Sequence, residues 1–231
     1  ATMTDSLNPW AAIVHPVLNG QVHLASKARL DDLNNQDKDF HLFHLKGVMQ
    51  TFFCEDYGPC GLAGLYQFTS ILNQKIRQYP GKTIVYCVEE RQRDVSDGVF
   101  FLGCYMIILK QMNVAEVWNE FESLACQLCG YRDASFCDSD FSLDILDCWR
   151  GMHQAKQIGW FDEIEIEEYV HYDNPLEGDL HTIIPGKLVA LRGPNHLSGQ
   201  KIYEDIEGHR RFSPRFFVAP FEDMGVRTVV R

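Results

Sequence analysis

The sequence contains no hydrophobic run long enough to cross a bilayer and no block of basic residues. Its most apolar window, Val99–Leu109, is about half the length that a transmembrane helix needs. The opening residues lack the basic and apolar stretches of a signal peptide. We therefore expect neither a membrane-spanning helix nor a secretory leader. With 21 Lys and Arg against 32 Asp and Glu, the chain is also a poor electrostatic match for a nucleic-acid backbone.

Cysteine and the familiar catalytic motifs are scarce as well. Eight cysteines in 231 residues are too dilute for a disulfide scaffold, so we expect reduced thiols and an intracellular compartment. No nucleophile elbow, P-loop or Gly-x-Gly-x-x-Gly motif occurs, and the histidines are scattered. Cys126 and Cys129 form a Cys-x-x-Cys pair, but no second pair completes a zinc site. No metal or cofactor is expected, and this pair is either incidental or a redox pair.

Acidic residues, by contrast, concentrate in one segment. Residues 162–179 carry eight acids and no Lys or Arg, so they supply −8 of the net charge of −11. Apolar and aromatic side chains, such as Ile166 and Tyr169, lie among the acids, which indicates a packed segment. Two interpretations stay open. The segment is either a solvated linker or an acidic wall for a basic peptide.

The order of hydrophobic patterns predicts an α/β fold. Strands are predicted at Gly20–Ser26, Phe40–Phe43, Gln50–Phe53 and Thr83–Val88, and helices at Leu62–Tyr79, Gly98–Met112, Val114–Leu128, Ser142–Ile158 and Glu163–Tyr169. Glu89–Asp97 is predicted to be a polar loop, and Pro175–Gly186 a break. Beyond the break we predict a strand at Lys187–Arg192, a helix from Ser213-Pro214 to Gly225, and a strand at Val226–Val230. This strand–helix–strand would begin a second domain.

Cys87 and Arg93 have the Cys-x5-Arg spacing of a cysteine-phosphatase phosphate loop, directly after the apolar strand. In such a loop the thiolate attacks phosphorus, while backbone amides and the arginine hold the phosphate. Here the loop contains no glycine, which disfavours tight wrapping of the backbone. Glu89 and Glu90 would repel a phosphate dianion and disfavour the thiolate. We predict a degenerate phosphate-loop position without catalysis.

Six collinear stretches together resemble the N-terminal half of the cell-division-cycle-fourteen type of dual-specificity protein phosphatases, the mitotic-exit phosphatases. They are Asp56–Ala63, Tyr131–Phe136, Leu143–Cys148, Glu168–Tyr172, Gly178–Leu180 with Ile183–Lys187, and Val226–Arg231. The resemblance covers the chain from about Trp10 onward. It implies two phosphatase-like α/β domains in tandem, each with a mostly parallel sheet flanked by helices, of which the first is not catalytic.

The resemblance also implies a division of the chain. Residues 1–9 would be a tail, 10–160 the non-catalytic domain, 161–186 an acidic linker helix and loop, and 187–231 the truncated start of the catalytic-type domain. The catalytic loop of the family would lie beyond Arg231. We therefore assign no catalytic residue and expect the chain to be inactive alone. The alternative is a stand-alone pseudophosphatase that acts as a binding or scaffold protein.

The family removes phosphate from phosphoserine followed by proline, favouring a basic residue a few positions on, through a phosphocysteine intermediate. By resemblance, an acidic groove reads the basic residue, and the candidates here are Asp133, Glu168, Asp173, Glu177 and Asp179. Val170 stands where the family has an acid. The implied partners are basic Ser-Pro phosphopeptides and the catalytic domain, with no nucleic acid or membrane. The implied locations are the nucleus and cytoplasm, with the centrosome or spindle.

Overall fold

The computed structural model describes residues 14–26, 40–45, 57–140, 142–161, 166–184, 186–206 and 209–230. The predicted strand Gln50–Phe53, Cys54 and the first acids of the acidic segment lie outside these residues. Contacts divide the chain into two units, Ala1–Gln157 and Ile158–Arg231. In the described part of the chain, no helix combines the length and the hydrophobicity that crossing a membrane requires.

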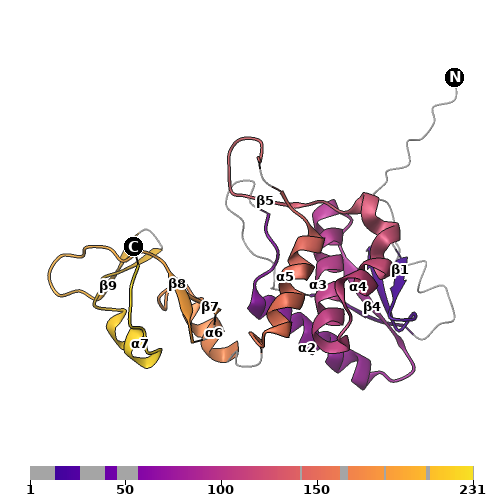
Figure 1. Cartoon of the computed structure of the whole chain (residues 1–231), viewed down its shortest axis with the longest axis horizontal. Helices are drawn as coiled ribbons and strands as arrows, with labels where there is room; N and C mark the ends of the chain where they lie inside the picture. The colour runs from indigo at the N-terminus through magenta and orange to yellow at the C-terminus, as the bar shows by residue number, and fades with distance from the viewer. Residues whose placement is uncertain are drawn as a thin grey trace. The chain divides into compact units, whose positions relative to one another are not determined.

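The first unit contains a four-stranded sheet in the order β1-β2-β4-β3, of which β1 and β4 are labelled in Figure 1. Its strands are β1 (Val14–Val17), β2 (Val22–Ser26), β3 (Phe40–Phe43) and β4 (Thr83–Val88). β2 and β3 run parallel to β4, while β1 pairs antiparallel with β2. The predicted α/β class with a mostly parallel sheet is confirmed. β1 was missed because it is a short edge strand with a proline, Pro16, in its middle.

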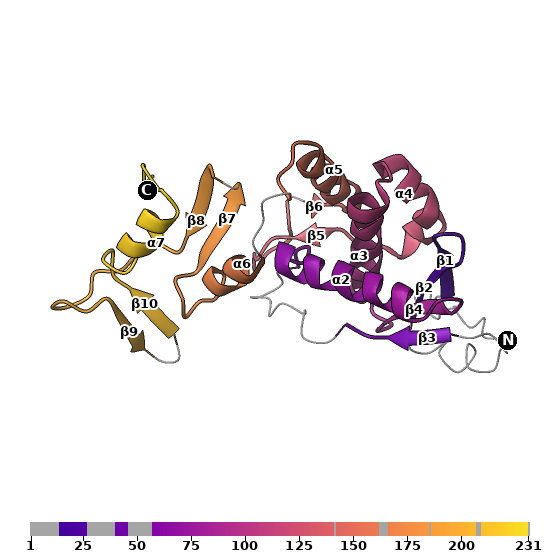
Figure 2. The same ribbon diagram turned by 90° about the horizontal axis from the view of Figure 1, so that it is seen from below.

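Helices lie on one side of this sheet (Figure 2). They are α2 (Leu62–Gln78), α3 (Gln92–Lys110), α4 (Val114–Phe121), the 3-10 helix η2 (Glu122–Gln127) and α5 (Ile145–Gln157). α3 is the central helix, which contacts β2 and β4 as well as α2, α4 and α5. Its residues from Gly98 to Ile107 are all buried, which explains the strongly apolar sequence there. The two-residue strands β5 (Tyr131–Arg132) and β6 (Ser142–Leu143) pair antiparallel.

The predicted polar loop Glu89–Asp97 is wrong in its second half, because α3 begins at Gln92. Arg91 donates two hydrogen bonds to Asp94, and the acid lies in the first helical turn. A negative charge is favourable at a helix N-terminus. Polar residues thus begin the helix here, and hydrophobic periodicity does not reveal such a start.

The second unit contains two antiparallel hairpins and two short helices. The hairpins pair β7 (Leu180–Ile184) with β8 (Leu188–Leu191) and β9 (Tyr203–Ile206) with β10 (His209–Phe212). The helices are α6 (Ile166–Tyr172) and α7 (Val218–Asp223). A small core of Leu180, Phe212 and Phe217 holds these elements together. The predicted short helix in the acidic segment is confirmed from Ile166 onward.

Three predictions for the second unit are wrong. The break Pro175–Gly186 contains β7. The hairpin of β9 and β10, in a stretch without a predicted strand, lies before Ser213. Turns follow Ser213, so α7 begins only at Val218. Val226–Val230 forms no strand, so the predicted strand–helix–strand is absent from the described residues. A β-branched sequence needs a partner strand for its backbone hydrogen bonds, and none pairs with these residues in the described structure.

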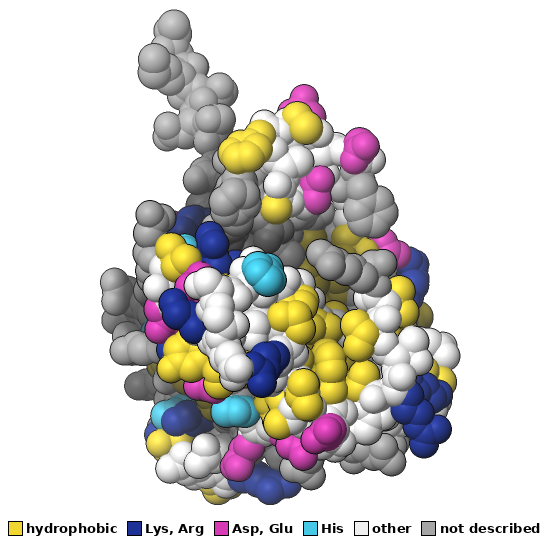
Figure 3. All heavy atoms as spheres, turned by 90° about the vertical axis from the view of Figure 1, so that its left-hand side faces the viewer, with side chains coloured by type: hydrophobic (Ala, Val, Ile, Leu, Met, Phe, Trp, Pro, Cys, Tyr) yellow, Lys and Arg dark blue, Asp and Glu magenta, His cyan; other side chains and the backbone are white. Residues whose placement is uncertain are grey.

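Several large hydrophobic side chains of the second unit remain exposed, among them Ile183, Leu188, Ile202 and Val218. Figure 3 shows hydrophobic side chains gathered on the face that it presents. Gathered exposed apolar side chains are typical of surfaces that contact another protein or domain.

Candidate functional site

Cys87 has the position of a phosphatase nucleophile but not its environment. It lies at the end of β4, before α3, and is 3% exposed. Side chains alternate across the sheet, so Cys87 packs with Ala25 and Val85 rather than with the main core. Its Sγ donates a hydrogen bond to the carbonyl of Val85 (3.7 Å). An apolar surrounding disfavours the thiolate, which is the reactive form.

Arg93 contacts the side chain of Tyr57. Its guanidinium lies over the ring of Tyr57, 4.9 Å from the centroid. The Tyr57 hydroxyl oxygen lies 2.9 Å from the carbonyl oxygen of Arg93 and 3.0 Å from Oδ1 of Asp97, so its one proton can be donated to either acceptor. To act as a phosphate fork, Arg93 would have to leave this ring.

Asp97, like Asp94, adds an acidic side chain close to the loop, besides the exposed Glu89 and Glu90. Burial raises the pKa of Asp97 to about 7; the hydrogen bond from Tyr57 opposes this, and the charge of Asp94 adds to it. In return, burial and the charge of Asp97 raise the pKa of Tyr57 far above its ordinary value. The acidic side chains beside the loop would repel a phosphate dianion, whereas a phosphate site needs positive charge.

The Cys126-x-x-Cys129 pair lies next to α3. Both thiols are free; Cys126 is exposed, whereas Cys129 is half-buried. The backbone N–H of Cys129 donates to Oγ of Ser96 (2.9 Å), and its sulfur lies 3.5 Å from the same oxygen. This contact gives Cys129 a structural role in attaching the chain to α3. No group of three or more His, Cys, Asp and Glu side chains in the described ranges is placed to hold a metal ion.

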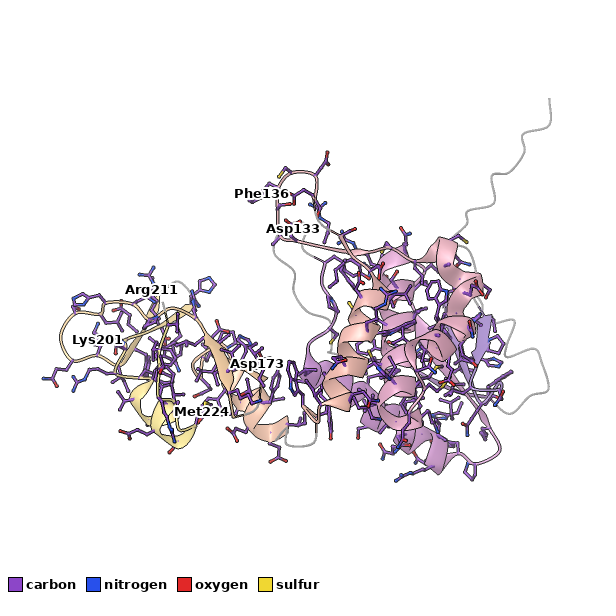
Figure 4. The ribbon with its side chains drawn as sticks, in the orientation of Figure 1. Asp133, Phe136, Asp173, Lys201, Arg211 and Met224 are labelled. Atoms are coloured by element: carbon purple, nitrogen blue, oxygen red, sulfur yellow. The ribbon has the colours of Figure 1, made fainter. Side chains whose placement is uncertain are left out.

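Asp133 lies on an exposed loop after β5, together with Phe136 (Figure 4). Its carboxylate accepts a hydrogen bond from Oγ of Ser135 (3.1 Å). The Arg132 guanidinium donates to the carbonyls of Ser135 (3.3 Å) and Cys137 (2.9 Å). The arginine thus fixes the loop from inside, while the Asp133 carboxylate and the Phe136 ring, 88% exposed, face solvent.

The other four candidate acids belong to the second unit. Glu168 is exposed on α6, Asp173 follows the helix, and Glu177 and Asp179 lie in the turn before β7. The structure brings Asp173 and Asp179 together around His181. The Nδ1 atom of His181 lies 2.5 Å from Oδ1 of Asp173, and its Nε2 atom lies 3.0 Å from Oδ1 of Asp179. Glu177 shares their turn, and its backbone N–H donates to the carbonyl of Asn174 (2.8 Å).

Sequence reasoning missed Tyr57, Asp97 and His181. Tyr57 meets Asp97 across 40 residues, and Asp97 fell inside a predicted loop. His181 was counted among the scattered histidines. Its spacing of two from Asp179, on alternate residues entering a strand, is the signal that could have pointed to their contact.

The family described as "Dual specificity protein phosphatase, N-terminal half" matches residues 17–155. Among curated proteins, the chain is similar to the dual specificity protein phosphatase CDC14C of Symphalangus syndactylus, with 29% identity over 216 residues, 90% of this chain and 44% of that protein. It is similar to CDC14A of Mus musculus, with 33% identity over 208 residues, 86% of this chain and 34% of that protein. It is also similar to the tyrosine-protein phosphatase cdc-14 of Caenorhabditis elegans, with 26% identity over 189 residues, 78% of this chain and 26% of that protein. The chain spans less than half the length of these relatives.

Proposed function

Since this chain belongs to the family of N-terminal halves of dual specificity protein phosphatases, and is the N-terminal region of the CDC14 type, we propose that it recognises substrate without hydrolysing it. One observation carries the proposal. At the Cys-x5-Arg position, the thiol is buried among apolar side chains and the arginine is stacked on Tyr57. Hydrolysis through a phosphocysteine would then take place in the catalytic half of the enzyme.

The 231-residue chain should not turn over para-nitrophenyl phosphate above the rate in buffer, because neither the Cys87 thiolate nor the Arg93 fork is available. Cys87→Ser should leave the background rate unchanged. Turnover by the wild-type chain that disappears in Cys87→Ser would contradict the proposal.

We propose further that the acids select peptides in which a basic residue follows phosphoserine-proline. Asp133 and Glu168 support this proposal because their side chains are exposed and can meet a cation. The concentration of acids at 162–179 supports the proposed recognition as well. Complementary charge speeds the association of a peptide and fixes its register more than it raises affinity. The affinity of this chain alone should therefore be weak.

A labelled phosphopeptide with Lys after Ser-Pro should bind more tightly than its Lys→Glu counterpart, as measured by fluorescence anisotropy. Raising the salt should weaken binding, since the Debye length falls from about 10 Å at 0.1 M to about 3 Å at 1 M. Asp173→Asn combined with Glu177→Gln should weaken binding about threefold to tenfold. Glu222→Gln with Asp223→Asn removes the same charge from α7 and should have a smaller effect. Salt-independent binding, or equal loss in both double variants, would contradict the proposed recognition.

The exposed hydrophobic side chains of the second unit support contact with the catalytic half. By family we propose a cell-cycle role, in the nucleus and cytoplasm, with the centrosome or spindle. A stand-alone scaffold would share the inactive Cys87–Arg93 region. The transcript beyond Arg231 separates the two: a His-Cys-x5-Arg loop favours the enzyme, and a stop codon favours the scaffold.

A further inference from the structure

The imidazole of His181 lies between two carboxylates that are candidates for peptide recognition. Its Nδ1 is 2.5 Å from Oδ1 of Asp173, and its Nε2 is 3.0 Å from Oδ1 of Asp179. All three side chains are partly exposed, at 37% for His181, 39% for Asp173 and 25% for Asp179. A ligand in solution can therefore reach the same carboxylates that the ring contacts.

The backbone holds this arrangement in place. The N–H of Asp173 donates to the carbonyl of Tyr169 (2.9 Å), which continues the last turn of α6. The N–H of Asp179 donates to the carbonyl of Asn174 (3.2 Å), and Asp179 has a φ of 53°. The carbonyl of Asp179 in turn accepts the N–H of Arg192 (3.2 Å) at the end of β8. The two acids thus have fixed backbones on both sides of a histidine that belongs to β7.

The proton count of the ring decides how well it satisfies both acids. A neutral imidazole carries one N–H, so it can donate to one carboxylate only, whereas the imidazolium donates to both. Hydrogen bonds between ionised groups are shorter and stronger than neutral ones. With the proton present, the three side chains carry a net charge of −1; without it, they carry −2. Histidine is the side chain that changes charge in the physiological pH range.

Other charged or titratable groups lie on the elements around His181. They are Glu167, Glu168, His171 and Tyr172 on α6, Glu177 in the turn, Lys187 and Arg192 at the ends of β8, and Arg210 on β10. Arg210 is already bound by Asp205 through two hydrogen bonds (2.8 and 3.0 Å) and donates to the carbonyl of Leu176. In the described structure, the acidic partners of the His181 ring are Asp173 and Asp179.

We propose that His181 is an internal counter-ion that competes with the basic residue of the peptide for Asp173 and Asp179, and so sets the pH at which this part of the chain reads a cation. This inference rests on the proposed recognition of basic peptides. At acidic pH the protonated ring occupies the two carboxylates. A ring without this proton can hold only one carboxylate, so the other becomes available to Lys or Arg. Binding of a basic peptide is therefore weaker at acidic pH. The cause is direct contact of His181 with the Asp173 and Asp179 carboxylates, not a change in the fold.

The test compares the wild-type chain with His181→Asn, using the labelled Ser-Pro-Lys phosphopeptide between about pH 5.5 and pH 8. The peptide phosphate also titrates in this range, so the informative quantity is the ratio of the two dissociation constants at each pH. His181→Asn should bind about threefold to tenfold more tightly than wild type near pH 5.5. The ratio of the two affinities should fall toward one as pH rises. His209→Asn, which changes an exposed histidine on β10, should show a ratio close to one throughout.

The outcomes separate the two proposals. If both chains bind and their ratio does not depend on pH, the competition by His181 is overturned while peptide recognition stands. If neither chain binds at any pH, the recognition itself is overturned, and the competition with it. His181→Gln serves as a second variant, and circular dichroism melts confirm that each variant is folded. A pH-dependent ratio in both variants, with none in His209→Asn, supports the counter-ion.

Discussion

Replacing Gly103 by alanine is expected to lower the free energy of unfolding of the first unit by about 3 kcal/mol. Gly103 lies in the middle of α3, and a Cβ there would overlap the indole ring of Trp149, at Cζ2 and Cε2. Trp149 is fully buried on α5, and its Nε1 donates a hydrogen bond to the carbonyl of Phe100 (3.2 Å). The ring cannot move aside without breaking this bond and repacking the contact between α3 and α5.

Gly151→Ala is the matched control for this result. Gly151 lies on α5, two residues after Trp149, and a Cβ there would meet no atom within 4 Å. Alanine should therefore stabilise the unit by about 0.5 to 1 kcal/mol, because it is the better helix former. Urea unfolding followed by circular dichroism measures both effects. Equal stabilities of the two variants would show that the Trp149 ring can move at little cost.

The elements that sequence predicts well are those whose whole length carries one hydrophobic period. α2 and β4 are examples, because nearly every turn or residue contributes to the core. β7, β9 and β10 are short and show partly exposed alternation. Their stability comes from the partner strand and from a small core, and a single strand's sequence records neither. The first turn of α3 was missed for a related reason, since its polar start depends on the pair of Arg91 and Asp94.

The same distinction applies to the candidate site, where some features can be predicted from the sequence and others depend on the tertiary fold. The spacing of Cys87 and Arg93 and the acids of the segment could be read directly from the sequence. The contact of Tyr57 with Asp97 and Arg93 needs the tertiary fold. The meeting of Asp173 and Asp179 at His181 needs a turn in which Asp179 adopts a positive φ. From the sequence alone, all of these acids are expected to be available to a ligand. In the structure, His181 already contacts Asp173 and Asp179.

Asp97→Asn is expected to stabilise the chain above pH 7 and to change it little near pH 5. The pKa of Asp97 is about 7 in the folded chain, against an ordinary value of 3.8, with burial as the main cause. Between these values the folded chain binds more protons than the unfolded chain. The free energy of unfolding therefore falls as pH rises from about 4 to about 7 through this group. At about 1.4 kcal/mol per pKa unit, the full effect is at most about 4 kcal/mol.

Asparagine removes this titration while it keeps an oxygen that can accept the hydrogen bond of the Tyr57 hydroxyl. We expect a gain of about 2 kcal/mol at pH 8, below this upper limit, because Asp97 is only half-buried and solvent screens part of the effect. Asp140→Asn, at an exposed acid of the same unit, is the control and should show no comparable pH dependence. Unfolding in urea at pH 5 and pH 8 measures the difference. If the gap between wild type and Asp97→Asn is the same at both pH values, Asp97 is not the buried proton carrier beside the degenerate loop. If the difference in free energy of unfolding between Asp97→Asn and wild type grows with pH, the ionised Asp97 carboxylate destabilises the folded chain. The same carboxylate adds negative charge beside the Cys87–Arg93 loop, where it disfavours a phosphate.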